Sequence, residues 1–186
     1  PRSLVMISLL TAVTCVLAYV IIPLPFSPVP VTGQTFGVML AGSLLRKRDG
    51  AISILLLLLL GFIGLPVFAG GKSGPGVLIG PTGGYLFAMP LSAYLTGWFL
   101  ETWFARRGRL HFGAYFLAHI LFGILGIYLI GVPWLSWQQH LPLQAAILAG
   151  ALPFLPGDLL KAAAAALVAV RLHRHGIIRH YGKEGG

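Results

Sequence analysis

Charged residues are scarce in this sequence. They account for 9% of its 186 residues, whereas 57% of the residues are hydrophobic and the mean hydropathy is +0.88. A water-soluble domain usually carries about 25% charged residues, so this chain lacks the charge to cover a surface exposed to water. Its apolar stretches of roughly 15 to 25 residues instead have the length that crosses a ~30 Å hydrocarbon core. The composition predicts an all-α, polytopic membrane protein whose residues 1–186 form a single membrane domain.

Acidic residues are rarer than basic ones, four against thirteen. In a soluble chain this excess would suggest nucleic-acid binding, but here the basic residues recur at alternate ends of the apolar segments. Lys and Arg gather at the cytoplasmic ends of membrane helices, so the pattern indicates topology and argues against a nucleic-acid partner. The predicted outer connections, 23–33, 66–81 and 132–142, hold one basic residue, Lys72. Both termini are therefore predicted to be cytoplasmic. The cytoplasmic basic residues are Arg2, Arg46, Lys47, Arg48, Arg106, Arg107, Arg109, Arg171, Arg174, Arg179 and Lys183.

Cysteine is nearly absent, and the common catalytic motifs are missing. The single cysteine, Cys15, excludes a disulfide framework. The sequence contains no HExxH, no Walker lysine, no GxGxxG and no nucleophile elbow, so little favours an enzyme or a bound nucleotide. His119 has no second His, Cys or carboxylate at ligand spacing, so we expect no metal site. A hydrogen bond between helices is the better interpretation of this histidine.

The hydrophobic pattern predicts a bundle of six transmembrane helices, and some of them are too short to span the membrane. At ~1.5 Å per residue, the segment from Gln34 to Arg46 rises about 18 Å and that from Asp158 to Arg171 about 20 Å. If the basic ends lie at the inner surface, these helices begin about 10 Å below the outer edge of the ~30 Å core. Irregular backbone at that depth survives only where protein buries it or where it lines a cavity. The outer half should therefore contain a pocket. The predicted helices are roughly 3–22, 34–46, 50–65, 82–105, 112–131 and a broken one over 143–173.

Two outer connections have a composition suited to such a pocket. Residues 23–35, "PLPFSPVPVTGQT", are rich in proline and carry no charge, so we expect a rigid, close-packed lid. Residues 68–87, "FAGGKSGPGVLIGPTGGYLF", are rich in glycine, which lets the backbone approach a ligand closely. Tight turns between short helices are the alternative explanation for both segments.

An acid and an amine lie three residues apart at the start of the last helix, in "PFLPGDLLK". Asp158 follows Pro156-Gly157, so one interpretation is a helix N-cap. An N-cap leaves Lys161 unexplained, because a charge at this depth costs about 2.5–3.5 kcal/mol. An i, i+3 pair presents a carboxylate acceptor and an ammonium donor on one face. Such a pair suits a ligand with N–H donors beside a carbonyl or an anionic group, and a proton relay through Asp158 is the alternative.

Other polar and small residues are weaker candidates. Gln34, preceded by Thr32, opens the second helix, where it could contact a ligand or cap the helix. Gly83, Gly84 and Tyr85 open the fourth helix, although a tyrosine at this level is usually a membrane-interface residue. On the first helix a face of small residues favours close helix packing, either inside the bundle or against another subunit. That face comprises Ser8, Thr11, Ala12, Cys15 and Ala18.

Three segments, "PVPVTGQTF" (28–36), "GPTGGYLF" (80–87) and "PFLPGDLLK" (153–161), resemble the signature segments of the BioY family. This family comprises the biotin-binding S-components of energy-coupling-factor (ECF) vitamin transporters. The resemblance implies a six-helix S-component fold in a prokaryotic cell membrane, with biotin held in the outer half. It also implies a transmembrane scaffold subunit and two cytoplasmic ATPases as partners, which use the ATP, while this chain binds no cofactor. The binding residues that it implies are Asp158, Lys161, Gln34, Gly83, Gly84 and Tyr85.

The resemblance is only approximate at the docking surface. S-components contact the scaffold through paired alanines on the first helix. Here the equivalent positions are Ser8 and Ala12, or Thr11 and Cys15. Two other functions stay open at this point. The chain could be an S-component for thiamine or riboflavin, or an intramembrane enzyme or proton-coupled carrier that uses Asp158.

Overall fold

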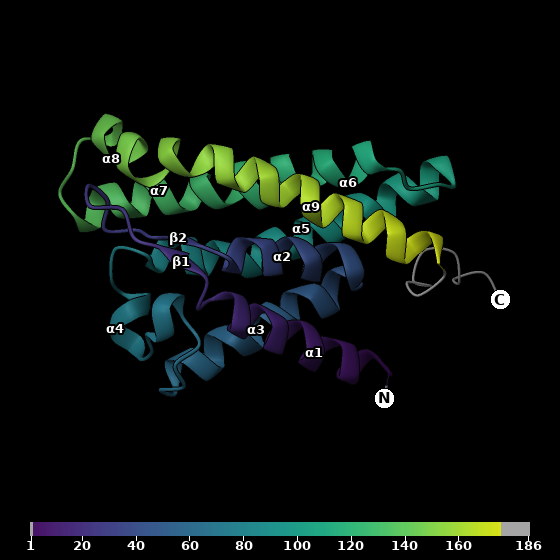
Figure 1. The fold of residues 1–186 in the computed structure, drawn as a ribbon, viewed down its shortest axis with the longest axis horizontal. Helices are drawn as coiled ribbons and strands as arrows, with labels where there is room; N and C mark the ends of the chain where they lie inside the picture. The colour runs from purple at the N-terminus through teal and green to yellow at the C-terminus, as the bar shows by residue number, and fades with distance from the viewer. Residues whose placement is uncertain (1, 176–186) are drawn as a thin grey trace.

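The computed structural model describes residues 2–175, and most of this part of the chain is helical. The predicted basic residues Arg179 and Lys183 lie outside the described residues. Figure 1 shows the arrangement of the elements. They are α1 (Arg2–Leu17), β1 (Ile21–Ile22), β2 (Val31–Thr32), α2 (Gln34–Leu44), α3 (Lys47–Phe62), η1 (Ala69–Gly71), α4 (Pro75–Leu78), α5 (Gly83–Arg107), α6 (Phe112–Ala118), η2 (His119–Leu125), α7 (Gly126–Gln138), α8 (Leu143–Gly150), η3 (Leu152–Phe154) and α9 (Leu155–Arg174).

Helices α2 and α5 lie in the middle of the bundle. They separate α1 and α3 on one side from α6, α7 and α9 on the other (Figure 1). Helix α9 begins at the left-hand end of the view, near β1 and β2, and ends at the right-hand end, where α1 begins. The start of the first helix and the end of the last therefore share one end of the bundle.

Each predicted helical segment has a counterpart, but several boundaries differ. Helix α1 ends at Leu17 and not at residue 22, because Ile21 and Ile22 pair antiparallel with Thr32 and Val31. The segment 132–142, predicted as an outer connection, is helical as far as Gln138. Helix continues from Phe112 to Gln138, with Pro133 inside it. Membrane helices tolerate an internal proline because neighbouring groups satisfy the freed backbone carbonyl.

The composition of α9 explains how it packs. Four of its alanines face the bundle at helical spacing, and small side chains there let helix backbones approach closely. The larger Leu159, Leu160 and Leu167 are exposed on the outside of the bundle. This face is suited to contact lipid, since apolar side chains there need no polar partner. The alanines that are fully buried on the inner face are Ala162, Ala165, Ala166 and Ala169.

Two helices in residues 2–175 are long and apolar enough to cross a membrane, by length and composition. They are Phe112–Gln138 and Leu143–Arg174, and Ser3–Leu17 is a shorter apolar helix. The last of these long segments is interrupted at η3, as the predicted break in 143–173 requires. Helix α9 begins directly after this interruption, and its first turns carry Asp158 and Lys161, which line the candidate site.

Candidate functional site

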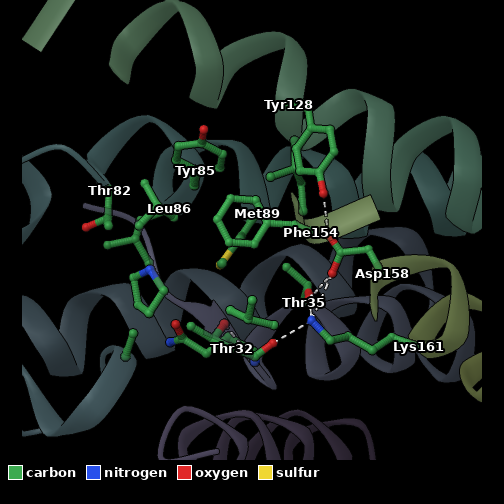
Figure 2. A pocket seen from close by; sticks show the side chains of 16 residues that line it. Thr32, Thr35, Thr82, Tyr85, Leu86, Met89, Tyr128, Phe154, Asp158 and Lys161 are labelled. Atoms are coloured by element: carbon green, nitrogen blue, oxygen red, sulfur yellow. Dashed lines mark hydrogen bonds and ion pairs between the residues drawn. The ribbon is translucent and has the colours of Figure 1, made fainter. Parts of the chain in front are cut away.

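A pocket lies where the first turns of α2, α5 and α9 meet the segment before α2 (Figure 2). Its empty space, open mouth included, is about 590 Å³. Apolar and polar residues both line it, and Thr35, Tyr128, Asp158 and Lys161 lie together at one end (Figure 2). The lining residues are Val29, Pro30, Val31, Thr32, Gln34, Thr35, Ala69, Thr82, Tyr85, Leu86, Met89, Ile127, Tyr128, Phe154, Asp158 and Lys161.

Asp158 and Lys161 form an ion pair inside this pocket. The Lys161 Nζ atom lies 2.8 Å from Asp158 Oδ1, and the side chains are 6% and 19% exposed for the acid and the amine. Asp158 does not cap its helix, because α9 already begins at Leu155 and Phe154 occupies the N-cap position. The capping interpretation is therefore wrong. The two charges lie on one face of α9 and both line the pocket, as the i, i+3 spacing predicts.

The Lys161 ammonium also ties the segment before α2 to α9. It donates to the Thr32 backbone carbonyl at 2.7 Å and to Thr35 Oγ1 at 3.1 Å. With Asp158 these acceptors engage all three ammonium protons. The Thr35 hydroxyl in turn donates to Asp158 Oδ1 at 3.3 Å. Neither threonine contact follows from the sequence, because both cross more than a hundred residues of chain.

The second oxygen of the Asp158 carboxylate accepts a hydrogen bond from the Tyr128 hydroxyl of α7. Figure 2 shows Tyr128 pointing across the pocket to Asp158, on the side opposite Lys161. Sequence reasoning missed Tyr128. The carboxylate is therefore held from α2, α7 and α9 together.

Gln34 lies within the pocket wall and is 1% exposed. Its Nε2 donates to the Val67 carbonyl at 3.3 Å, and its backbone N–H donates to Thr32 Oγ1 at 3.3 Å. The N-cap of α2 is Gly33, without a side-chain cap, so the capping interpretation of Gln34 is also wrong. Gln34 joins the pocket to the loop that precedes η1.

Gly83, Gly84 and Tyr85 position the part of α5 that forms one wall of the pocket. Tyr85 lines the pocket, but its hydroxyl donates to the Gly150 carbonyl at 2.8 Å. Gly83 and Gly84 are not among the described residues that line the pocket. A Cβ atom on Gly84 would collide with the Trp134 side chain, and one on Gly83 with the Leu78 carbonyl. The two glycines thus allow α5 to approach α7 and α4 closely.

The small residues on the predicted face of the first helix differ in their exposure. Thr11 and Ala18 are buried, and the Thr11 hydroxyl bonds the Ile7 carbonyl and Ser53. Ser8 and Ala12 are exposed and Cys15 is half-buried. The exposed pair, one helical turn apart, is available to a partner, whereas the buried residues pack inside the bundle.

His119 is fully buried and lies 3.2 Å, through Nε2, from the Ser43 hydroxyl of α2. This contact agrees with the predicted hydrogen bond between helices. Within residues 2–175 no group of three His, Cys, Asp or Glu side chains could hold a metal ion.

Apolar helices around one buried charge pair, in a pocket open at one end, define a membrane-embedded helical bundle with a small-molecule site. The model of the BioY family matches residues 1–177. The chain is 41% identical to the probable biotin transporter BioY of Bacillus subtilis, over 89% of this chain and 87% of that protein. It is 40% identical to the biotin transporter BioY of Thermotoga maritima, over 93% and 96%. The chain belongs to the BioY family.

One solved structure has the same fold. It is the crystal structure of the S-component for biotin from an ECF-type ABC transporter. The TM-score is 0.90 at 34% sequence identity, and the match covers 97% of this chain and 95% of that one. The S-component fold implied by the three sequence segments is therefore confirmed, as is the membrane location that goes with this family.

Proposed function

We propose that this chain captures biotin in the pocket described above and is the substrate-binding S-component of an ECF-type importer. The observation that carries the proposal is the Asp158–Lys161 pair at one end of a partly apolar pocket, in a chain of the BioY family. Biotin likewise has one polar end and a larger apolar part. Its ureido ring offers two N–H donors and a carbonyl, while its sulfur-containing ring and valeryl chain are apolar.

The polar end of the pocket can satisfy the ureido group. Asp158 accepts an N–H, and the Lys161 ammonium donates to the ureido carbonyl. Since all three ammonium protons are engaged, the carbonyl takes the place of one present acceptor. Thr35 Oγ1 is the acceptor to be displaced, because its 3.1 Å contact is the longest of the three. Thr35 then keeps its bond to Asp158.

The apolar part of biotin packs against the rest of the lining. Val29, Leu86 and Ile127 supply aliphatic surface there, worth about 25 cal/mol per Å² of apolar area removed from water. Thr32 and Gln34 border the polar end. Gly83, Gly84 and Tyr85 hold the wall in place, which is a role in shape more than in direct contact.

We further propose six membrane crossings with both termini in the cytoplasm and the pocket in the outer half. Three observations support this topology. The basic clusters alternate along the chain, and the start of α1 and the end of α9 share one end of the bundle. The pocket lies away from that end, at the first turns of α2 and α9. Residues 23–35 form a lid, because Val29 to Thr32 line the pocket and Thr32 is bonded to Lys161.

Transport itself needs partners, since the sequence has no nucleotide-binding motif. We propose a transmembrane scaffold subunit and two cytoplasmic ATPases that hydrolyse the ATP. The exposed Ser8 and Ala12, with Cys15 beside them, are the docking surface for the scaffold. Small residues at such a surface let helices of two subunits pack closely.

The test is equilibrium binding to the detergent-purified chain, by calorimetry, with biotin, thiamine and riboflavin. We expect saturable binding of biotin alone at one site. Binding of thiamine or riboflavin without biotin would assign the pocket to another vitamin and refute the proposal.

A further inference from the structure

Tyr128 holds the oxygen of Asp158 that Lys161 does not reach. Oδ1 of Asp158 accepts from Lys161 and Thr35, whereas Oδ2 accepts from the Tyr128 hydroxyl. A carboxylate oxygen has about two acceptor directions. Within the described part of the chain, Oδ2 therefore keeps one acceptor direction beyond the bond from Tyr128. The direction of that remaining lone pair depends on the torsion of the carboxylate, which Tyr128 restrains.

The helix that carries Tyr128 is distorted in a way that brings it to this place. His119 and Tyr128 lie nine residues apart, which at ~100° per residue in a regular α-helix puts them on opposite faces. Both nevertheless face the α2–α9 side, where His119 contacts Ser43 and Tyr128 contacts Asp158. The π-helical segment His119–Leu125 between them explains the difference. One extra residue in a π-type turn rotates the following helix by about 100°, and such turns are frequent at functional sites.

The other side of the Tyr128 ring borders an apolar groove between α7 and α8. The remaining described residues of this groove are all hydrophobic; they are Leu125, Leu129, Val132, Pro133, Leu143, Ile147 and Ala151. No group on this side can replace the hydroxyl as a donor to Asp158. A buried carboxylate oxygen without a hydrogen-bond donor is destabilised, because no hydrogen bond offsets its removal from water.

We propose that Tyr128 is a positioning residue for ligand recognition, and this inference rests on the proposed binding of biotin. Its hydroxyl fixes the Asp158 carboxylate so that Oδ2 presents its free lone pair to one ureido N–H. The ring at the same time closes the polar end of the pocket against the groove between α7 and α8. Tyr128 thus acts on the ligand through Asp158, and its effect depends on the N–H that Asp158 accepts.

The experiment combines Tyr128→Phe with two ligand analogues. In each analogue, a cyclic carbamate, one ureido N–H of biotin is replaced by a ring oxygen. By calorimetry, Tyr128→Phe should bind biotin at least about 10-fold more weakly, which is ~1.4 kcal/mol. For the carbamate that lacks the N–H accepted by Asp158, the same substitution should change affinity less than about threefold, since the bond it supports is already gone. Tyr115→Phe is the matched control, because Tyr115 lies in the same continuous helix and its buried hydroxyl has no partner among the described residues.

Equal losses for biotin and both carbamates would overturn the inference, because a general loosening of the pocket treats all three ligands alike. An unchanged biotin affinity in Tyr128→Phe would overturn it as well, while leaving the proposed function intact. Absence of biotin binding by the unaltered chain would refute the proposed function and this inference with it.

A second measurement covers the case in which Tyr128→Phe does not fold. 3-Fluorotyrosine incorporated at position 128 keeps both the ring and the hydroxyl. Its ¹⁹F resonance should shift on addition of biotin, and shift less with the carbamate that lacks the N–H accepted by Asp158. A resonance that biotin leaves unmoved would contradict the proposed role.

Discussion

Removing either charge of the Asp158–Lys161 pair should weaken biotin binding strongly. Asp158→Asn keeps the size of the side chain but replaces the carboxylate with a neutral amide, and Lys161→Met keeps the length but removes the ammonium. A hydrogen bond to a charged group is worth about 1.5–3 kcal/mol. Each substitution should therefore weaken binding by about 10- to 150-fold, at ~1.4 kcal/mol per decade.

The two substitutions should differ in their effect on the free energy of unfolding. Lys161→Met leaves a carboxylate that is 6% exposed without its counter-charge, and breaking a buried pair in this way costs about 3–5 kcal/mol. Tyr128 and Thr35 still donate to that carboxylate, which puts the cost near the lower end. Asp158→Asn should cost less, because the ammonium is 19% exposed and keeps the Thr32 carbonyl as an acceptor.

The double variant separates folding from binding. With both charges gone, no unpaired charge is left in the pocket, so thermal unfolding in detergent should show recovered stability. Biotin affinity should stay as low as in the weaker single variant, because neither polar contact to the ureido group returns. Calorimetry and thermal unfolding on all four proteins test this. Near-native biotin affinity in the double variant would refute the reasoning, since it would mean that the pair serves the fold alone.

Three further predictions concern topology, the lid and helix packing. In a Cys15→Ser background, an impermeant thiol reagent applied from outside should label Trp137→Cys and not Gly108→Cys; the reverse pattern would overturn the proposed orientation. Biotin should slow backbone hydrogen exchange in residues 23–35, and unchanged exchange in a biotin-saturated sample would count against a lid. Gly84→Ala should lower the unfolding temperature, because overpacking costs about 1–3 kcal/mol and the new Cβ meets Trp134. Gly76→Ala, where a Cβ has open space, is the control, and equal effects of the two would refute the packing argument.

Much of the fold follows from local features of the sequence. The hydrophobic segments and the basic residues at their ends predict the membrane bundle, because both are visible along the chain without knowing how the helices pack. The Asp158–Lys161 pair is equally local, since helical spacing puts residues i and i+3 on one face wherever the helix lies. Boundaries were less predictable. Helix α1 ends five residues early because Ile21 and Ile22 pair with β2, and α7 continues through Pro133 because the bundle around it accommodates the proline.

The direction in which each side chain faces needed the tertiary structure. The spacing of small residues on α1 could not separate Ser8 and Ala12, which are exposed, from Thr11, which is buried against α3. The family resemblance implies ligand contacts for the glycines of "GPTGGYLF", and the structure adds that Gly84 makes room for Trp134, fifty residues further along the chain.

The sequence by itself determined that this is a membrane protein with one charge pair at the start of its last helix. It also carried three segments that resemble the family whose model matches residues 1–177. Only the tertiary structure decided what surrounds that pair. The Thr32 carbonyl and Tyr128 reach Lys161 and Asp158 from distant parts of the chain, and Tyr128 does so through a π-helical turn that no regular periodicity predicts. Such contacts depend on how whole helices pack and rotate, and packing is a property of all the helices together.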